Sequence, residues 1–143
     1  EYLRTGKYEK FRNEVKTLLK NSVSFRDLKE ENSYHLFVMG MVAIMYENYY
    51  IKSNYESGDG IPDLVLKPKN KKDTAFIFEF KYSRAKDSKN LKRTAKSALK
   101  QINDRNYADG LKYEGYENIT KIGMGFRKKD VEVAIEIEFI IEE

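Results

Sequence analysis

The stretch GIPDLVLKPKNKKDTAFIFEFKYS, residues 60–83, contains the pattern that decides the fold of this chain. Two runs with strand composition, 62–67 and 74–83, flank the turn residues of KPKNKKD and predict a hairpin. In the second run, aromatic side chains occupy one face, whereas the other face carries an isoleucine followed by Glu79 and Lys81. A strand that is apolar on both faces is normally covered on both sides. We therefore expect this strand at the centre of a sheet, with both charges at the edge of a buried layer.

The composition of the 143-residue chain is that of one globular domain. It is 41% hydrophobic and has no Pro-, Gly- or Ser-rich linker, so we expect one domain over residues 1–143, with a helical extension at 1–29 and a core at 30–143. No apolar run is long enough to span a membrane, and no secretory leader opens the sequence. Because cysteine is also lacking, we expect a soluble, cytoplasmic protein without disulfides. The first residue is a glutamate, and we expect a fragment of a longer chain.

Hydrophobic periodicity predicts an α/β fold with a mixed five-stranded sheet flanked by helices. The core is expected to run as a helix, three strands in an antiparallel meander, a helix and two more strands. Gly110 is expected to close the last helix. In the last strand Glu132, Glu136 and Glu138 alternate with apolar residues, so we expect these acids to face water. The predicted helices are 6–20, 33–49 and 89–107, and the predicted strands are 50–57, 62–67, 74–83, 121–126 and 130–140.

The register of the predicted hairpin decides whether Asp63 and Glu79 meet. If Lys67 pairs with Ala75, Asp63 lies opposite Glu79, and the two carboxylates share one face with their Cβ atoms about 5 Å apart. A register shifted by one residue places Asp63 opposite Phe78 and sends the two acids to opposite faces of the sheet. Only the first register places the two carboxylates close enough to form one site.

Two carboxylates at that distance require a cation, and hard divalent ions take oxygen ligands. Mg²⁺ in particular accepts one or two carboxylates and keeps several waters. Lys81 follows Glu79 on the same face, where it can orient or deprotonate a water. Two carboxylates that bind a metal and a lysine that positions a water are the groups that metal-assisted hydrolysis of a phosphodiester requires. A glutamate and a lysine at this spacing also form an ordinary ion pair, and this alternative stays open.

The charge is unevenly distributed. The net charge is +4, from 27 basic and 23 acidic residues, and the basic residues concentrate between Lys67 and Lys100. Lys92, Lys96 and Lys100 run along one flank of the predicted helix 89–107, where we expect them to contact the phosphates of a nucleic acid. A solvated helix face is the alternative for these lysines.

The dipeptide PD at 62–63, followed by EFK at 79–81, resembles the motif of the PD-(D/E)XK nuclease superfamily. More narrowly, the segments YHLF, YESGDGIPDLVL, FIFEFKYS, AKSALKQINDRNYAD and KIGMGF resemble the nuclease-type domain that follows an AAA-ATPase-like domain in many bacterial proteins. The resemblance covers roughly residues 30–130. It implies a restriction-endonuclease-like core and, in the full-length chain, an AAA-ATPase-like domain as a partner.

The resemblance implies a role for each residue that matches the motif. Asp63 and Glu79 would be metal ligands, and the backbone carbonyl of Phe80 a further ligand. Lys81 would be the base that positions the water. Gln101 matches a polar position that the superfamily often places near the active site on the following helix.

Three further positions are informative. His35 matches a histidine that some relatives carry on the first core helix as an additional metal ligand, although a lone histidine is commonly structural. Glu56 matches an acidic position of the narrower family and is a second-tier site residue, with a role at a turn or strand end as the alternative. Ile61 stands where the narrower family commonly has an arginine, which puts substrate contact at that position in doubt.

These observations lead us to expect a nuclease that uses Mg²⁺ or Mn²⁺ to hydrolyse phosphodiester bonds of nucleic acid, with DNA as the first candidate substrate. The alternative is a catalytically inactive module of nuclease fold that serves binding or regulation in a larger ATPase-like protein. The presence of Asp63, Glu79 and Lys81 together favours the enzyme. An enzyme acting on small molecules has little support, because the sequence lacks a phosphate-binding glycine loop and a nucleophile elbow.

Overall fold

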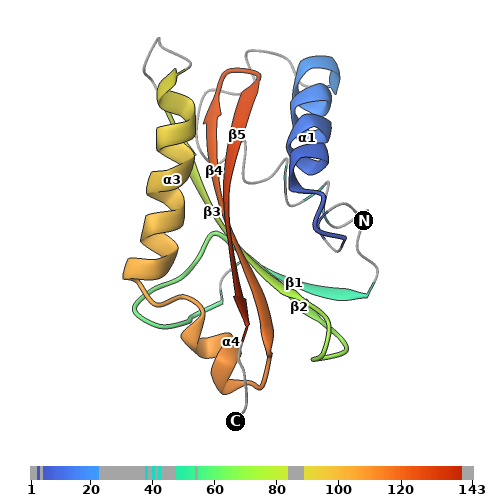
Figure 1. Cartoon of the computed structure of the whole chain (residues 1–143), viewed down its shortest axis with the longest axis vertical. Coiled ribbons are helices and arrows are strands. Elements are labelled where there is room, and N and C mark those ends of the chain that lie inside the picture. Colours follow the sequence, from blue (N-terminus) through green and yellow to red (C-terminus); the bar gives the residue numbers. More distant parts are fainter. Residues whose placement is uncertain are drawn as a thin grey trace.

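The computed structural model has a five-stranded sheet with strand order β1-β2-β3-β4-β5 and with a long helix on each face (Figure 1). It describes residues 3, 5–22, 38, 40, 42, 48–53, 55–83 and 89–139. The helices are α1 (Tyr8–Ser22), α3 (Lys89–Asp104) and α4 (Asp109–Tyr113), and the strands are β1 (Tyr49–Lys52), β2 (Leu64–Pro68), β3 (Ala75–Tyr82), β4 (Asn118–Arg127) and β5 (Asp130–Phe139).

The sheet is mixed, as the sequence predicts. Strands β1, β2 and β3 pair antiparallel in chain order and form the expected meander. Strands β3 and β4 pair parallel, because α3 carries the chain back across one face of the sheet before β4 begins. A two-residue turn then returns the chain into β5, which pairs antiparallel with β4. Strand β3 is therefore the central strand, which confirms the interpretation of its two apolar faces.

The register between β2 and β3 is the one that a site requires. Leu64 pairs with Phe78, and Leu66 pairs with Phe76. Continued by one residue, this register places Asp63 opposite Glu79. The shifted register, with Asp63 opposite Phe78, is excluded.

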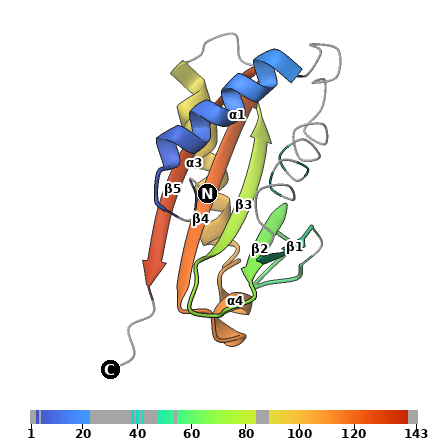
Figure 2. The ribbon, with the colours of Figure 1, turned by 90° about the vertical axis from the view of Figure 1, so that its right-hand side faces the viewer.

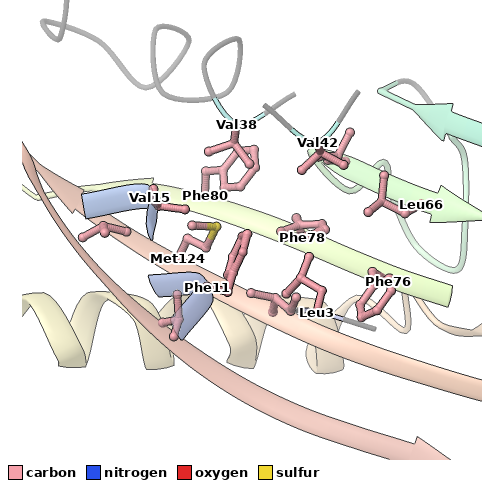
Figure 3. Packing of buried hydrophobic residues seen from close by; sticks show 14 of the residues in the cluster. Leu3, Phe11, Val15, Val38, Val42, Leu66, Phe76, Phe78, Phe80 and Met124 are labelled. Carbon is pink, nitrogen blue, oxygen red and sulfur yellow. The ribbon is translucent and has the colours of Figure 1, made fainter. Parts of the chain in front are cut away.

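Two hydrophobic clusters lie on opposite faces of the sheet. On the α1 face, Phe11 and Val15 of the helix pack against Phe76, Phe78 and Phe80 of β3 (Figure 3). Figure 2 shows α1 crossing the sheet on this side, with α3 behind it. On the α3 face, Ile77 packs in a separate cluster that includes Ile102 of α3. Alternation along β3 thus divides one strand between two cores.

Three predicted boundaries were wrong or incomplete. Strand β1 ends at Lys52 instead of continuing to 57, since its partner β2 begins at Leu64, one residue before the Val65 that pairs with Lys52. The chain then turns at Ser57 and Gly60, which form an isolated bridge. Gly110 does not close the long helix; it lies inside α4, where a Cβ atom would come within 2.4 Å of the Ser57 hydroxyl. Most of the predicted helix 33–49 lies outside the described residues. Tyr49 belongs to β1, and the helical residues Val38 and Val42 are fully buried.

The acids of β5 do not simply face water. Glu132 pairs with Arg12 of α1, with 3.1 Å between the guanidinium nitrogen and the carboxylate oxygen. Glu136 and Glu138 both form ion pairs with Lys121 of β4. Lys121 is only 7% exposed. Lys121 and Lys112 together hold the pKa of Glu138 below its ordinary value, against an opposing effect of burial. The prediction holds for Glu136, which is exposed, and is incomplete for Glu132 and Glu138, because alternation gives the face of a side chain but not its partners.

Among the helices that the structure describes, none combines the length and the apolar composition needed to cross a bilayer.

Candidate active site

The carboxyl groups of Asp63 and Glu79 lie against each other at the start of β2 and within β3. The Asp63 backbone N–H donates to Oε2 of Glu79 over 3.3 Å, and the Phe80 backbone N–H donates to Oδ2 of Asp63 over 2.7 Å. Each carboxylate is therefore fixed by the backbone of the opposite strand. This cross-bonding follows directly from the β2–β3 register.

Glu79 occupies an unfavourable place for a negative charge. The residue is 6% exposed, and burial together with the nearby negative charge of Asp63 raises its pKa to about 8, although Lys81 opposes the shift. In the absence of a cation, simultaneous ionisation of both carboxyl groups is therefore disfavoured. A divalent cation between the two groups would supply the positive charge that both ionised carboxylates need.

Helix α3 contributes two polar side chains to the same place. Gln101 donates from Nε2 to Oε1 of Glu79 over 2.8 Å. One turn earlier, Ser97 accepts a hydrogen bond from Nζ of Lys81 over 3.0 Å. The Lys81 ammonium therefore bonds to a hydroxyl group of α3. The carboxyl group of Glu79 accepts its hydrogen bonds from Gln101 and from the Asp63 backbone, not from Lys81.

Two glycines on β4 allow α3 to approach the site. Gly123 pairs with Glu79 and Gly125 pairs with Lys81 across the parallel ladder. A Cβ atom at Gly123 would lie 2.3 Å from the carbonyl oxygen of Ala95 and 2.5 Å from the amide nitrogen of Leu99, both on the α3 backbone. A Cβ at Gly125 would lie 2.8 Å from the Leu91 carbonyl oxygen. The helix therefore rests directly on the strand next to the site residues.

An open cleft of about 700 Å³ begins beside Lys81. It lies between the carboxyl end of β3 and the first turns of α3, and it is hydrophilic and basic on the helix side. Its lining residues are Lys81, Tyr82, Ser83, Asn90, Arg93, Thr94 and Ser97. The cleft therefore reaches the site at Lys81, while the two carboxylates lie outside its lining.

The residues present fit a hard divalent cation. Asp63 and Glu79 supply carboxylate oxygens from two adjacent strands, and a neutral amide, not a competing cation, holds the buried acid. Within the described part of the chain, no group of three or more His, Asp or Glu side chains gathers in one place. A pair of carboxylates is a sufficient protein contribution for Mg²⁺, which keeps several waters.

The roles predicted for the remaining site residues are not established by the described part of the structure. His35 lies outside the described residues, so its role as a ligand stays a prediction, as does that of the Phe80 carbonyl. Glu56 is exposed between β1 and the Ser57–Gly60 bridge. On α3, Lys92 donates to the Val133 carbonyl of β5.

The lysines predicted to bind nucleic acid lie along one flank of α3, four residues apart. Lys96 is exposed, and Lys100 pairs with Asp104 one turn later over 2.5 Å. Lys92 lies about 180° around the helix from Gln101, at 100° per residue. These residues follow a different flank from the one that reaches Glu79, and their part in nucleic-acid binding stays a prediction.

Sequence reasoning did not single out Ser97, Gly123 or Gly125. A usable signal was present for the glycines: in KIGMGF they occupy alternate positions of a strand, so both project from the same face. Glycine inside a strand often marks the close approach of another backbone. Ser97 carried no signal of its own, because only the packing of α3 brings it to Lys81.

Comparison with known proteins gives a consistent result. The family model of the PD-(D/E)XK nuclease superfamily matches residues 29–136, most of the chain. A search of curated proteins found no match.

Proposed function

The chain belongs to the PD-(D/E)XK nuclease superfamily and has its restriction-endonuclease-like fold, and on this premise we propose that it is a nuclease dependent on Mg²⁺ or Mn²⁺. The observation that carries the proposal is the pairing of Asp63 with Glu79 across β2 and β3. DNA is the proposed substrate.

Asp63 and Glu79 would hold the cation, with the Phe80 carbonyl and His35 as further ligands. When bound, the cation supplies Lewis acidity that lowers the barrier to attack on the phosphate and offsets the charge that develops there. A bound cation would favour the ionised form of Glu79, since a ligating carboxylate is deprotonated.

The other side chains act on the water and on the ligand geometry. Lys81 orients the attacking water, and Ser97 holds the lysine side chain beside the cleft. Gln101 fixes Oε1 of Glu79, which limits rotation of that carboxyl group. The water oxygen bonds to phosphorus while the opposite ester P–O bond breaks. The water supplies the proton that the leaving oxygen takes up, so the products are a phosphomonoester end and a hydroxyl end.

The test is incubation of the chain with labelled DNA and RNA panels in Mg²⁺, Mn²⁺, Ca²⁺ or chelator. We expect cleavage of DNA with Mg²⁺ or Mn²⁺ and none with chelator. Asp63→Asn should remove this cleavage, because it removes a ligand without removing volume. An Asp63→Asn chain that cleaves at the parent rate would exclude the assignment of the site.

The matched control is Asp73→Asn, which changes the same residue type in the β2–β3 turn at the opposite end of the hairpin. We expect it to retain parent activity. If the parent chain binds DNA but cleaves none of the panel with any of the metals, the inactive binding module replaces the enzyme.

A further inference from the structure

A second basic hollow lies away from the paired carboxylates, at the end of the sheet where the β4–β5 turn meets the end of α1. Figure 1 shows this turn between the end of α1 and the start of α3. The hollow measures about 390 Å³. Its polar lining comes from two lysines of α1 and from the turn itself: Lys16, Lys20, Arg127, Lys128, Lys129 and Asp130.

The charge of this hollow is strongly one-sided. Five cationic side chains face one carboxylate, and Asp130 is already paired with Lys16, with 3.0 Å between nitrogen and oxygen. Lys129 donates to the Lys20 carbonyl in the last turn of α1 over 3.2 Å. A hollow lined by charges of one sign concentrates ions of the opposite sign.

The dipole of α1 explains only part of this cluster. Cations near the end of α1 are favoured by the helix dipole, which accounts for Lys20 and Lys129. It does not account for Lys128, which holds a φ of 52° in a two-residue hairpin turn. Glycine and asparagine are the residues that take this conformation at little cost. A lysine at that position adds charge at the expense of backbone strain.

The spacing from the candidate active site suits an extended polyanion. Glu79 pairs with Gly123, and Arg127 follows four residues later on the same strand. At about 3.3 Å per residue, the separation along the strand is about 13 Å. One strand of duplex DNA advances about 3.4 Å per nucleotide, so this distance is close to four nucleotides.

We propose that this basic hollow is a second DNA contact, which binds backbone phosphates about four nucleotides from the cleaved bond. The proposal takes its ligand class from the nuclease function proposed above. Lysine and arginine contact phosphate oxygens without reading sequence. Among the described residues that line the hollow, none is aromatic, so base stacking is not its mode of binding. The part of the DNA bound here is therefore its phosphate backbone, which a duplex presents on its outer surface.

The test measures binding without cleavage. A fluorescein-labelled 20-base-pair DNA duplex is titrated with protein in chelator at several NaCl concentrations. In the triple variant Lys20→Gln, Lys128→Gln and Lys129→Gln we expect affinity to fall about 10-fold or more. The slope of log affinity against log salt should decrease in magnitude by about 2 to 3, because each phosphate contact contributes about 0.9.

The matched control is Lys69→Gln, Lys71→Gln and Lys72→Gln, which removes the same charge from the exposed β2–β3 turn at the opposite end of β3. We expect this control to bind nearly as the parent does. Equal losses in the two variants, or a parent chain that does not bind the duplex at low salt, would overturn the proposal.

A single variant keeps the test independent of folding. Lys128→Gly removes one charge and relieves the positive φ, so its melting temperature should equal or exceed that of the parent while DNA affinity falls several-fold. Parent affinity in Lys128→Gly would contradict the proposal. Because no divalent cation is present, these results stand apart from metal-dependent cleavage, whose loss in Asp63→Asn tests the nuclease function.

Discussion

On β3, side chains one residue apart serve two different purposes. Toward α1, Phe76, Phe78 and Phe80 form an aromatic row that is buried from end to end (Figure 3). Toward α3, the buried Ile77 is followed by Glu79 and Lys81. Packing on the α1 face stabilises β3. This stabilisation offsets the cost of the buried carboxyl group on the α3 face, which lowers the stability of the fold when it ionises. Each experiment below compares the two faces or sharpens that comparison.

The largest effect on stability is expected at Phe78→Ala. The ring is fully buried, and its centroid lies 6.4 Å from that of Phe11 and 6.1 Å from that of Phe80. Its loss should lower the free energy of unfolding by about 3–5 kcal/mol. Chemical denaturation of the parent and the variant measures the difference. The neighbouring substitution Glu79→Gln should lower the free energy of unfolding far less. Equal decreases for the two variants would refute the division of roles between the two faces of β3.

A second, smaller effect is expected where α3 meets β4. Gly123→Ala introduces a Cβ atom that overlaps the backbone of Ala95 and Leu99, which cannot rotate away as a side chain would. We expect a loss of about 1–3 kcal/mol in stability, as for an overpacked core, and reduced cleavage because Gln101 and Ser97 move with the helix. Thermal melting and the cleavage assay measure the two consequences.

The control for this prediction is the same substitution in open space. Gly40 is helical and exposed, and no atom of the described residues lies within 4 Å of a Cβ built there. Gly40→Ala should raise stability by about 0.5–1 kcal/mol. The explanation by helix contact fails if both substitutions shift the melting temperature in the same direction.

Titration of Glu79 predicts a pH dependence of stability in chelator. Its pKa is about 8 in the folded chain and 4.5 as the ordinary value, so the folded state binds the proton more tightly. The resulting stabilisation is fully present below pH 4.5 and is lost as the pH rises through about 8. Denaturation at a series of pH values should show this fall, and Glu79→Gln should flatten it. A variant with the same pH profile as the parent would mean that Glu79 ionises normally.

The smallest effect concerns the lysine flank of α3. Lys92 and Lys100 already have partners on the protein, whereas Lys96 is exposed. We expect Lys96→Gln to reduce the salt slope of DNA binding by about 1 at most. Lys10→Gln, at an exposed position on α1, is the matched control. If the two slopes are the same, the Lys96 flank is only a solvated surface.

Much of the fold could be predicted from the sequence because it depends on local periodicity. The alternation in β3 was enough to predict a central strand, and it led to the question of register that the Leu64–Phe78 pairing answers. The juxtaposition of Asp63 and Glu79 follows from that register alone. Periodicity does not predict partners that depend on side-chain packing. Neither the bond from Lys81 to Ser97 nor the burial of Lys121 beside Glu138 could be derived from it, although each pair joins neighbouring elements.

The basic hollow was missed for a related reason. The sequence concentrates basic residues between Lys67 and Lys100, and this concentration suggested one basic region. The hollow instead joins lysines of α1 to the β4–β5 turn, from opposite ends of the chain. Charge counted along a sequence cannot identify a cluster that only the fold assembles.

The central claim is that Asp63 and Glu79 together bind one divalent cation, and calorimetric titration with Mn²⁺ tests it most directly. The parent chain should bind one Mn²⁺ per molecule at pH 8. Asp63→Asn and Glu79→Gln should each weaken binding about 10-fold or more while retaining a cooperative melting transition. Parent affinity in either variant would contradict the claim.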